Sequence, residues 1–406
     1  MIKDDFLSGI FYSVPNLRYY HSDKLSKVKL GNICSITGGY AFDSRKMKSK
    51  GEYQIIKMGN LYNGVLDLTR NPSFIDNPTK KELEYLIHKN DMLITLTGTV
   101  NKKDYGYTVQ LNNPNNLLLN QRCALIKPLN INEKYLFYLL NSNNFFKQFY
   151  ASSTGGTGNQ TNVSINDMLN FNMYIANEKN QIIISEFLNK IDQRIETQIK
   201  IISSIESQIK SINNHVAFDS ATNELSIGNL FDIKTNSKIL EKHDGKYCIV
   251  DMGTIDSNGN YITGKYTDDI TSILTKGTLV MPKDDIGGGK IICKTLYINE
   301  SNKYVLSDHV FALKLRNSKY NPLYFSSLIN SQYHNHNLKR LVTGSAQLGI
   351  NQENLNKYKL RFSDCLDLQK KYSKLIQLIN EKLFIEKKLL YNLYNQKNYL
   401  MKNMFI

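Results

Sequence analysis

The chain has 406 residues, of which 41% are hydrophobic and 21% charged. This composition excludes wholesale disorder, a collagen-like repeat and a disulfide-stabilised miniprotein, and the length predicts two or three domains that each bury a core. Lysine and arginine total 51 against 36 acidic residues, and the net charge of +15 indicates either a polyanionic partner or a generally basic composition.

Residues 1–24 are predicted to be an N-terminal extension. Their apolar stretch is short and is interrupted by Gly9, Ser13 and Pro15, which is not typical of a signal peptide. No window of the chain reaches about 18 uninterrupted apolar residues, the length that a membrane span needs. The five cysteines include no C-x-x-C pair, which argues against a structural zinc site or a secreted disulfide framework. We therefore expect a cytoplasmic protein with reduced thiols.

A first mixed α/β domain is predicted for residues 25–178. Short apolar runs such as 92–96, separated by Asn-Gly, Gly-Asn and Asn-Pro turn signals, predict strands. Between them, residues 81–88 and 133–149 have the spacing of helices.

Residues 179–216 are predicted to form one long helix with a coiled-coil seam. Apolar residues recur at alternating steps of four and three, which is the heptad spacing of core positions. The predicted core positions are Ile184, Leu188, Ile191, Ile195, Gln198, Ile202, Ile205, Ile209 and Ile212.

The second half of the chain repeats the first. Residues 30–33 (LGNI) recur as 227–230 (IGNL), and 53–59 (YQIIKMG) recur as 247–253 (YCIVDMG). Further weak matches follow in the same order, so the chain is predicted to be a tandem duplication with a period of about 190 residues. The second domain is accordingly expected at residues 217–365 and the second helix at 366–406.

The second helix has the same seam as the first. Its predicted core positions are Tyr372, Ile376, Ile379, Leu383, Glu386, Leu390, Leu393, Lys397 and Leu400. A seam needs a partner, and a whole domain separates the two helices in sequence, so we predict that they pair with each other in antiparallel orientation. Gln198 and Glu386 are the middle core positions of their helices; either they meet and fix the register, or they are tolerated interruptions that point to solvent.

Several short segments resemble catalytic or metal-binding motifs, but each lacks residues or spacing that its motif requires. Residues 71–74 (NPSF) lack the second proline of an adenine methyltransferase loop, and 287–290 (GGGK) lack the flanking residues of a phosphate-binding loop and predict a flexible hairpin. The order of residues 283–285 (KDD) and the nearby lysines is wrong for a magnesium nuclease cluster. His334 and His336 have no ligand partners at metal spacing and are expected to be solvated. We predict no catalytic residue and no metal site.

Polar and basic residues on turn segments are the candidates for contacts with DNA, because such segments can approach phosphates or enter a groove. An ordinary solvated surface position remains the alternative for each. The candidates are Arg45, Lys46, Lys48, Lys102, Lys103, Tyr105, Thr154, Asn159, Gln160, Lys283, Lys290, Lys339, Arg340 and Gln347.

A set of segments in fixed order carries a resemblance to a known family. The segments are 15–19 (PNLRY) with 29–33 (KLGNI), 90–99 (NDMLITLTGT), 119–124 (LNQRCA) with its copy 306–311 (LSDHVF), and the small-residue loops 153–164 and 343–351. Together with the two seams, they resemble the specificity subunit of Type I restriction-modification enzymes over essentially the whole chain. The chain lacks the tryptophan often found near the family's opening motif, and Thr278 replaces an acidic residue in the second copy.

The resemblance implies an α+β fold with a pseudo-twofold internal repeat, in which two target-recognition domains are joined by two antiparallel spacer helices. It implies a non-catalytic subunit whose domains each read one half of an asymmetric bipartite DNA site, while the helices fix the spacing and dock the methyltransferase subunits. The implied partners are double-stranded DNA, two modification (methyltransferase) subunits and two restriction (nuclease-translocase) subunits. S-adenosylmethionine, ATP and Mg²⁺ are expected in those subunits, and no cofactor is expected on this chain.

Two other functions compete with this one. The chain could be a coiled-coil scaffold that does not bind DNA, and its positive charge argues only moderately against that role. It could instead be a stand-alone restriction or modification enzyme, which the absence of a cofactor or metal motif disfavours.

Overall fold

The computed structural model describes residues 25–62, 64–100, 102–155, 160–218, 222–262, 264–345 and 347–405. The predicted extension 1–24, with its motif at 15–19, lies outside these residues. The chain forms two compact units: unit 1 comprises Met1–Glu196 with Tyr391–Ile406, and unit 2 comprises Thr197–Leu390. Within the described ranges, no helix is both long enough and apolar enough to cross a membrane.

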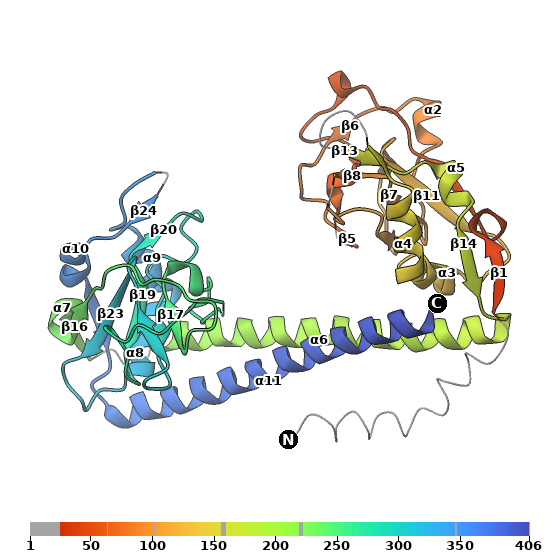
Figure 1. Ribbon diagram of the computed structural model, residues 1–406. Helices are drawn as coiled ribbons and strands as arrows, with labels where there is room; N and C mark the ends of the chain where they lie inside the picture. Colours follow the sequence, from red (N-terminus) through yellow and green to blue (C-terminus); the bar gives the residue numbers. More distant parts are fainter. Residues whose placement is uncertain are drawn as a thin grey trace. The chain divides into compact units, whose positions relative to one another are not determined.

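The centre of unit 1 is a four-stranded antiparallel sheet in the order β2-β11-β7-β9 (Figure 1). Its strands are β2 (Cys34–Gly38), β11 (Cys123–Pro128), β7 (Met92–Thr95) and β9 (Thr108–Gln110). All four residues of β7 are buried, as expected of a central strand that is covered on both faces.

Smaller sheets surround this centre. In the order β10-β3-β6, strand β10 (Leu117–Leu119) pairs parallel with β3 (Tyr53–Ile56), whereas β6 (Phe74–Ile75) pairs antiparallel. The remaining strands of unit 1 are β1 (Ser26–Lys29) with β14 (Asn172–Ile175), β12 (Thr154–Gly155) with β13 (Gln160–Asn162) and β8 (Thr97–Thr99), and β4 (Leu61–Tyr62) with β5 (Val65–Leu66).

The short helices of unit 1 differ from the sequence prediction in two places. They are η2 (Leu30–Asn32), η3 (Ser44–Lys46), η4 (Met58–Asn60), α2 (Lys80–Leu83), α3 (Glu133–Leu139), α4 (Asn143–Ala151) and α5 (Ile165–Leu169). Residues 81–88 contribute only the single turn α2. The predicted helix 133–149 is two helices, because the Ser142 side chain accepts a hydrogen bond from the Phe145 amide and thereby caps the start of α4.

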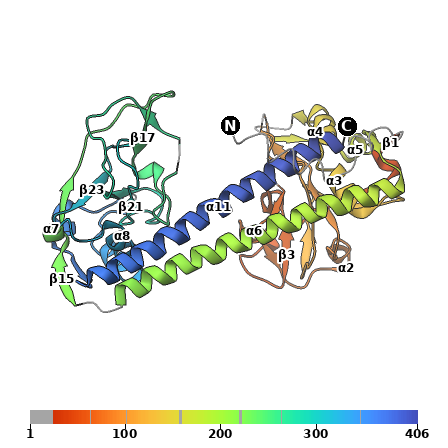
Figure 2. The same cartoon turned by 90° about the horizontal axis from the view of Figure 1, so that it is seen from below.

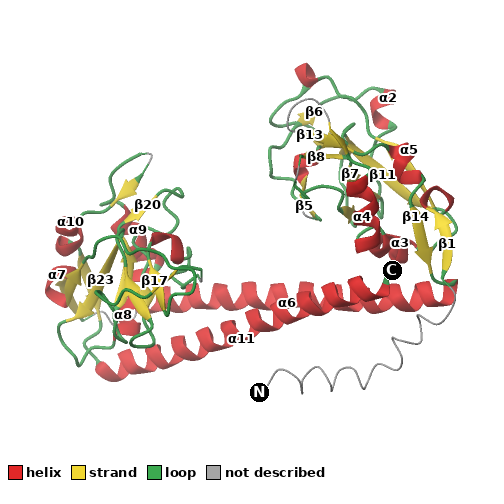
Figure 3. Ribbon diagram, in the orientation of Figure 1, coloured by secondary structure: helices red, strands yellow, loops and turns green. Residues whose placement is uncertain are grey.

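Unit 2 repeats the main sheets of this skeleton. The order β16-β23-β19-β21 matches β2-β11-β7-β9, and β18-β17-β22 matches β6-β3-β10, including the parallel pair. Its strands are β15 (Asn223–Ser226), β16 (Phe231–Lys234), β17 (Tyr247–Val250), β18 (Tyr266–Thr267), β19 (Leu279–Pro282), β20 (Asp284–Asp285), β21 (Leu296–Tyr297), β22 (Tyr304–Leu306), β23 (Val310–Leu315), β24 (Leu348–Gly349) and β25 (Lys359–Phe362). Its short helices are α7 (Ile227–Leu230), η5 (Met252–Thr254), α8 (Pro322–Asn330), α9 (Gln332–Lys339) and α10 (Gln352–Lys357). The strand order thus confirms the duplication. Figure 3 shows the strands of both units in yellow.

Each unit ends in one long helix, α6 (Glu178–Phe218) after unit 1 and α11 (Leu366–Met404) after unit 2. The start of each helix is held by a buried glutamine. Gln181 accepts from the Asn132 amide at 3.0 Å and donates to the Ala176 carbonyl at 2.8 Å. Gln369 makes the same pair of bonds, to Asn321 and Ser363.

Within unit 2, α6 and α11 pack along the predicted seam in antiparallel orientation (Figure 2). Ile202, Ile205 and Leu383 form a buried cluster. Ile209, Ile379 and Leu390 pack on it, half-buried, and Ile376 is buried too. At the end of this segment, Gln198 Nε2 donates to Glu386 Oε2 at 2.5 Å and to the Glu386 carbonyl at 3.1 Å. Gln198 is 5% exposed, so the alternative of a side chain in solvent is wrong.

Within unit 1, the other ends of the two helices contact the domain and each other. The predicted seam positions Ile184, Leu188, Ile191, Ile195, Leu393 and Leu400 are buried. The ammonium of Lys397, a polar member of the seam, lies 2.6 Å from the Asp192 carboxylate, and the same carboxylate accepts from the Tyr138 hydroxyl at 2.8 Å.

Candidate nucleic-acid interface

The parallel strand pair brings two loops of each unit to one edge. Because β3 and β10 run parallel, the loops at their carboxyl ends, residues 57–60 and 120–122, lie at the same edge of the sheet. The same geometry in unit 2 joins residues 251–254 and 307–309, after β17 and β22. We call these loops the strand-end edge of each unit.

In unit 1 the strand-end edge offers cationic hydrogen-bond donors. Arg122 is exposed, and its Nη1 lies 3.8 Å from Met58 Sδ, which shows that the two loops touch. Lys57 Nζ donates to the Ser73 hydroxyl at 2.6 Å. Neither cation has a carboxylate partner among the described residues, so both keep donors for an anionic or acceptor-rich ligand.

The loop that presents Lys57 is held rigidly. The Asn60 side chain is 1% exposed, accepts from the Lys57 amide at 3.0 Å, and donates to the carbonyls of Asp67 and Arg70. The Arg70 guanidinium in turn lies 4.7 Å from the centre of the Tyr62 ring. A polar side chain satisfied in this way fixes the loop without itself being available to a ligand.

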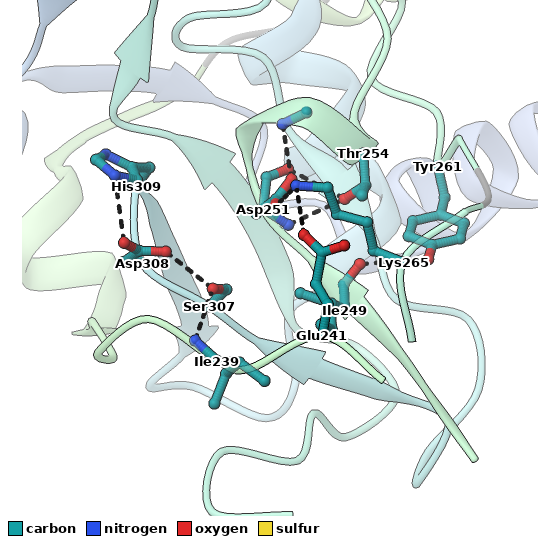
Figure 4. A network of polar contacts seen from close by, with 11 residues as sticks. Ile239, Glu241, Ile249, Asp251, Thr254, Tyr261, Lys265, Ser307, Asp308 and His309 are labelled. Carbon is teal, nitrogen blue, oxygen red and sulfur yellow. Dashed lines mark hydrogen bonds and ion pairs between the residues drawn. The ribbon is translucent and has the colours of Figure 1, made fainter. Parts of the chain in front are cut away.

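In unit 2 the same edge carries carboxylates (Figure 4). The His309 ring lies between two of them, with Nδ1 at 2.7 Å from Asp284 Oδ2 and Nε2 at 3.2 Å from Asp308 Oδ2. The Ser307 hydroxyl donates to Asp308 at 2.9 Å. The His309 ring is thus held between two acceptor carboxylates.

A second ion pair completes the edge of unit 2. Lys265 Nζ lies 2.6 Å from Asp251 Oδ2 and 3.2 Å from Glu241 Oε1. The hydrogen bond to Asp251 raises the pKa of Lys265, with a smaller contribution from Glu241. By the repeat, Asp251 occupies the position of Lys57, and His309 that of Arg122. The two strand-end edges therefore share one backbone arrangement and differ in the charges of their side chains.

The predicted candidates after β2 lie on the surface of unit 1. Lys46 is exposed, and the Arg45 guanidinium binds the Asp43 carboxylate at 2.9 Å, which lowers the pKa of Asp43. The Lys48 ammonium lies 2.8 Å from Asp76. An exposed pair of this kind contributes little to stability and can be exchanged for a phosphate.

The candidates after β8 divide into exposed and buried residues. Lys102 and Lys103 are exposed, and the Lys103 ammonium lies 5.7 Å from the centre of the Tyr150 ring. The prediction of Tyr105 as a DNA-contacting residue is wrong. Tyr105 is 3% exposed and packs against Phe149 and Tyr150, because the Gly98 and Gly106 backbones leave room for these rings.

The remaining candidates are on the small sheets and the last helices. Thr154 and Gln160 are exposed on β12 and β13, and Gln347 and Arg340 are exposed in unit 2. The candidates Lys283, Lys290, Lys339 and Asn159 differ in placement. Lys283 is half-buried with its ammonium 6.0 Å from the Phe311 ring centre, Lys290 and Lys339 line a cavity, and Asn159 lies outside the described residues.

Two fragments set aside in the sequence have structural roles. Residues 287–290 do not form a hairpin, because β20 pairs with β24; the loop is wound around the Asp285 carboxylate, which accepts from the amides of Gly287, Ile291 and Ile292. His334, expected in solvent, is 1% exposed, and its Nδ1 lies 2.8 Å from the Tyr358 hydroxyl. In the described part of the chain, no group of three or more His, Cys, Asp or Glu side chains could hold a metal ion.

Sequence reasoning missed the residues of the strand-end edges. Lys57, Arg122, Asp251, Asp308 and His309 were quoted only as parts of repeated motifs. A signal was available, because these positions fall inside the best-matched segments of the repeat and yet differ in charge between the copies. What the sequence could not supply was the parallel pairing of strands about 60 residues apart, which brings the loops together.

Both the sequence and the fold of this chain are similar to known proteins. Residues 23–207 match the family model described as the Type I restriction modification DNA specificity domain. No curated protein sequence matches the chain significantly. The fold is similar to the crystal structure of the S subunit of a Type-I restriction-modification system from M. genitalium, with a TM-score of 0.60 at 16% identity, covering 95% of this chain and 97% of that chain. A chain from a structural study of complex assembly and conformational transition in the type I R-M system gives a TM-score of 0.53 at 11% identity, covering 93% and 96%.

Proposed function

We propose that this chain is a specificity subunit of a Type I restriction-modification enzyme, and that its two units read the two halves of one asymmetric bipartite DNA target. The observation that carries the proposal is the repeated strand-end edge. A repeated skeleton presents similar loops to two stretches of a duplex, and different side chains on those loops read different bases.

The side chains at the two edges suit different partners in the groove. Arg122 and Lys57 of unit 1 are donors, which pair with phosphates or with the acceptor edge of guanine. In unit 2, Asp308 and Asp284 are acceptors, which pair with the amino groups of cytosine or adenine, and His309 supplies a donor beside them. The two half-targets therefore differ in sequence.

The partner subunits supply the chemistry. In this proposal the chain takes no part in catalysis; two modification subunits supply methylation with S-adenosylmethionine, and two restriction subunits supply cleavage with ATP and Mg²⁺. Recognition of the DNA sequence comes from this chain alone.

The helices offer a surface on which methyltransferase subunits dock. On α11, large apolar side chains are exposed in addition to the buried seam: Leu375, Leu378, Phe384, Ile385 and Leu389 are 40–70% exposed. An apolar surface of this kind marks a site of protein association.

The experiment is to co-express the chain with its modification subunit and to map the methylated sequence by single-molecule sequencing. We expect two short motifs of different sequence separated by a fixed unread gap. Arg122→Ala should relax only the half read by unit 1, and His309→Ala only the half read by unit 2. Each removes a base or phosphate contact and leaves the other unit unchanged.

Two outcomes contradict the proposal. A single uninterrupted motif would show that the units do not read separate halves. No sequence-dependent methylation, together with no retention of random duplexes at low salt, would favour the scaffold function instead.

A further inference from the structure

Unit 2 contains a large open cavity between its domain and its helices. It has a volume of 1640 Å³, and α6, α8, α9, α11 and the segment 294–299 contribute to its walls. Asp251, Asp308 and His309, which define the strand-end edge of unit 2, do not line it. The cavity is therefore separate from the edge proposed to read DNA.

Three lysines from three elements meet in this cavity: Lys210 from α6, Lys294 from the loop before β21, and Lys339 from α9. Lys294 Nζ donates to the Asn330 carbonyl at 3.3 Å, and Lys339 Nζ donates to the Gly289 carbonyl at 2.6 Å. An ammonium has three donors, and none of the three lysines has a carboxylate partner in the part of the chain that the structure describes. Several N–H donors thus remain for a ligand.

The segment that carries Lys294 is held in place on both sides. The Asn330 side chain accepts from the Thr295 amide at 2.7 Å and donates to the Thr295 carbonyl at 2.8 Å. On the other side, Asn335 Nδ2 donates to the Cys293 carbonyl at 2.9 Å. These bonds preorganise the lysine, so that a ligand does not have to order it.

The electrostatics of the cluster are unfavourable without an anion. Burial, and then the like charges of Lys339 and Lys210, lower the pKa of Lys294 to about 8. A cation placed in this way is stabilised when a negative ligand arrives.

The internal repeat shows that the skeleton does not require these lysines. In unit 1 the bonds between Asn330 and Thr295 are repeated by Asn141 and Thr108, with distances of 3.1 and 3.2 Å. The neighbours that correspond to Lys294 and Lys339 are then Tyr107 and Tyr150, and Lys210 corresponds to Asn398 on α11. One skeleton thus folds with uncharged residues in one copy and with three cations in the other.

Because three lysines without carboxylate partners among the described residues line one cavity, we propose that the cavity of unit 2 binds a phosphate-bearing anion. Lys210, Lys294 and Lys339 are its ligands. The phosphate belongs either to a free small molecule or to the backbone of the bound DNA, and the chemistry of recognition is the same for both.

The test titrates inorganic phosphate into the full chain by calorimetry, at constant ionic strength in a chloride buffer. We expect saturable binding to the wild-type chain. The double variant Lys294→Gln/Lys339→Gln should bind phosphate at least tenfold more weakly, as should Lys210→Gln, whose exposed side chain can be changed without disturbing the core. Lys314→Gln, an exposed lysine on β23 outside the cavity, is the matched control and should bind like the wild type. Circular dichroism verifies that each variant is folded.

A second arm identifies the source of the phosphate. The salt dependence of duplex binding is measured for the complex of the chain with its modification subunit. A smaller salt slope in Lys210→Gln assigns the phosphate to DNA, and an unchanged slope with weaker phosphate binding assigns it to a small molecule. The proposal is overturned if the cavity variants match the wild type in both arms, or if Lys314→Gln loses phosphate binding to the same degree. Neither result would bear on the bipartite target.

Discussion

His334 on α9 is a buried residue whose ionisation opposes the fold of unit 2. Burial, together with the charge of Arg361, lowers its pKa from 6.5 to about 4, and its hydrogen-bond partner is the Tyr358 hydroxyl. The ring is therefore neutral at pH 7 in the folded chain. In the unfolded chain it takes up a proton below pH 6.5, so the stability that the neutral ring supports is present above that pH and is lost as the pH falls toward 4.

We predict that His334→Gln flattens the acid sensitivity of unit 2. Between pH 6.5 and 4 the wild-type free energy of unfolding should fall by roughly 3 kcal/mol more than that of the variant, which is the linkage expected for this pKa shift. Urea unfolding across this pH range measures the difference. His336→Gln is the control, because His336 is exposed on the same helix. Parallel pH profiles for the wild type and His334→Gln would contradict the linkage.

Residue types alone did not show which polar and aromatic side chains are buried. Tyr105 was predicted at the surface because it follows a glycine turn, but its ring fills the space above Gly98. Asp285 was already excluded from a nuclease cluster by its spacing, but the sequence did not show that its carboxylate accepts hydrogen bonds from three backbone amides of its own loop. Both outcomes depend on what packs opposite the residue, and that is set by the tertiary fold.

The long helices, in contrast, could be predicted from sequence because their packing is periodic. A heptad seam specifies which side chains are buried before any partner is known, and it did so for α6 and α11. The prediction of a single helix over residues 133–149 was wrong, because apolar periodicity does not show where one helix ends and the next begins. Its apolar spacing continues through the break, and only the cap at Ser142 reveals two helices.

We predict that Gln198 and Glu386 act as a pair in setting the register of α6 and α11. Gln198→Leu leaves the half-buried Glu386 carboxylate without its donor, and should lower the free energy of unfolding of unit 2 by about 1–3 kcal/mol. Gln198→Leu with Glu386→Leu should recover most of that loss, because both polar groups are removed together. Urea unfolding of the two single variants and the double variant gives the coupling energy.

Pairing specificity separates this role from simple stability. The double variant should pair partly between chains, which light scattering detects as dimers, because an all-apolar seam no longer favours one register. Gln208→Leu, at an exposed position of α6, controls for added hydrophobicity. If Gln198→Leu alone is more stable than the wild type and its light scattering is unchanged, the pair does not set the register.

At the scale of the whole chain, the duplication explains why fold and function could be inferred together. Both copies retain the sheet order, the buried glutamine at the start of the helix and the parallel pair that forms the strand-end edge. The side chains on that edge and in the cavity of unit 2 are where the copies diverge. Shared positions thus report the skeleton, and divergent positions report what each unit binds.

The spacing between the two half-targets should depend on the lengths of α6 and α11, because each helix passes from one unit into the other. Seven residues make two helical turns and rise about 10.5 Å. We predict that inserting one heptad into both helices, between residues 196 and 197 and between 390 and 391, lengthens the unread gap by up to about three base pairs. The two half-motifs should stay the same, because neither strand-end edge is altered. Mapping the methylated sequence measures the gap.

The same insertion in α6 alone is the control for this prediction. It lengthens α6 only and should destabilise the chain, since the inserted core positions of α6 then have no partners on α11. An unchanged gap after insertion into both helices would mean that the helices do not set the spacing, and that the units hold their positions on DNA through the partner subunits instead.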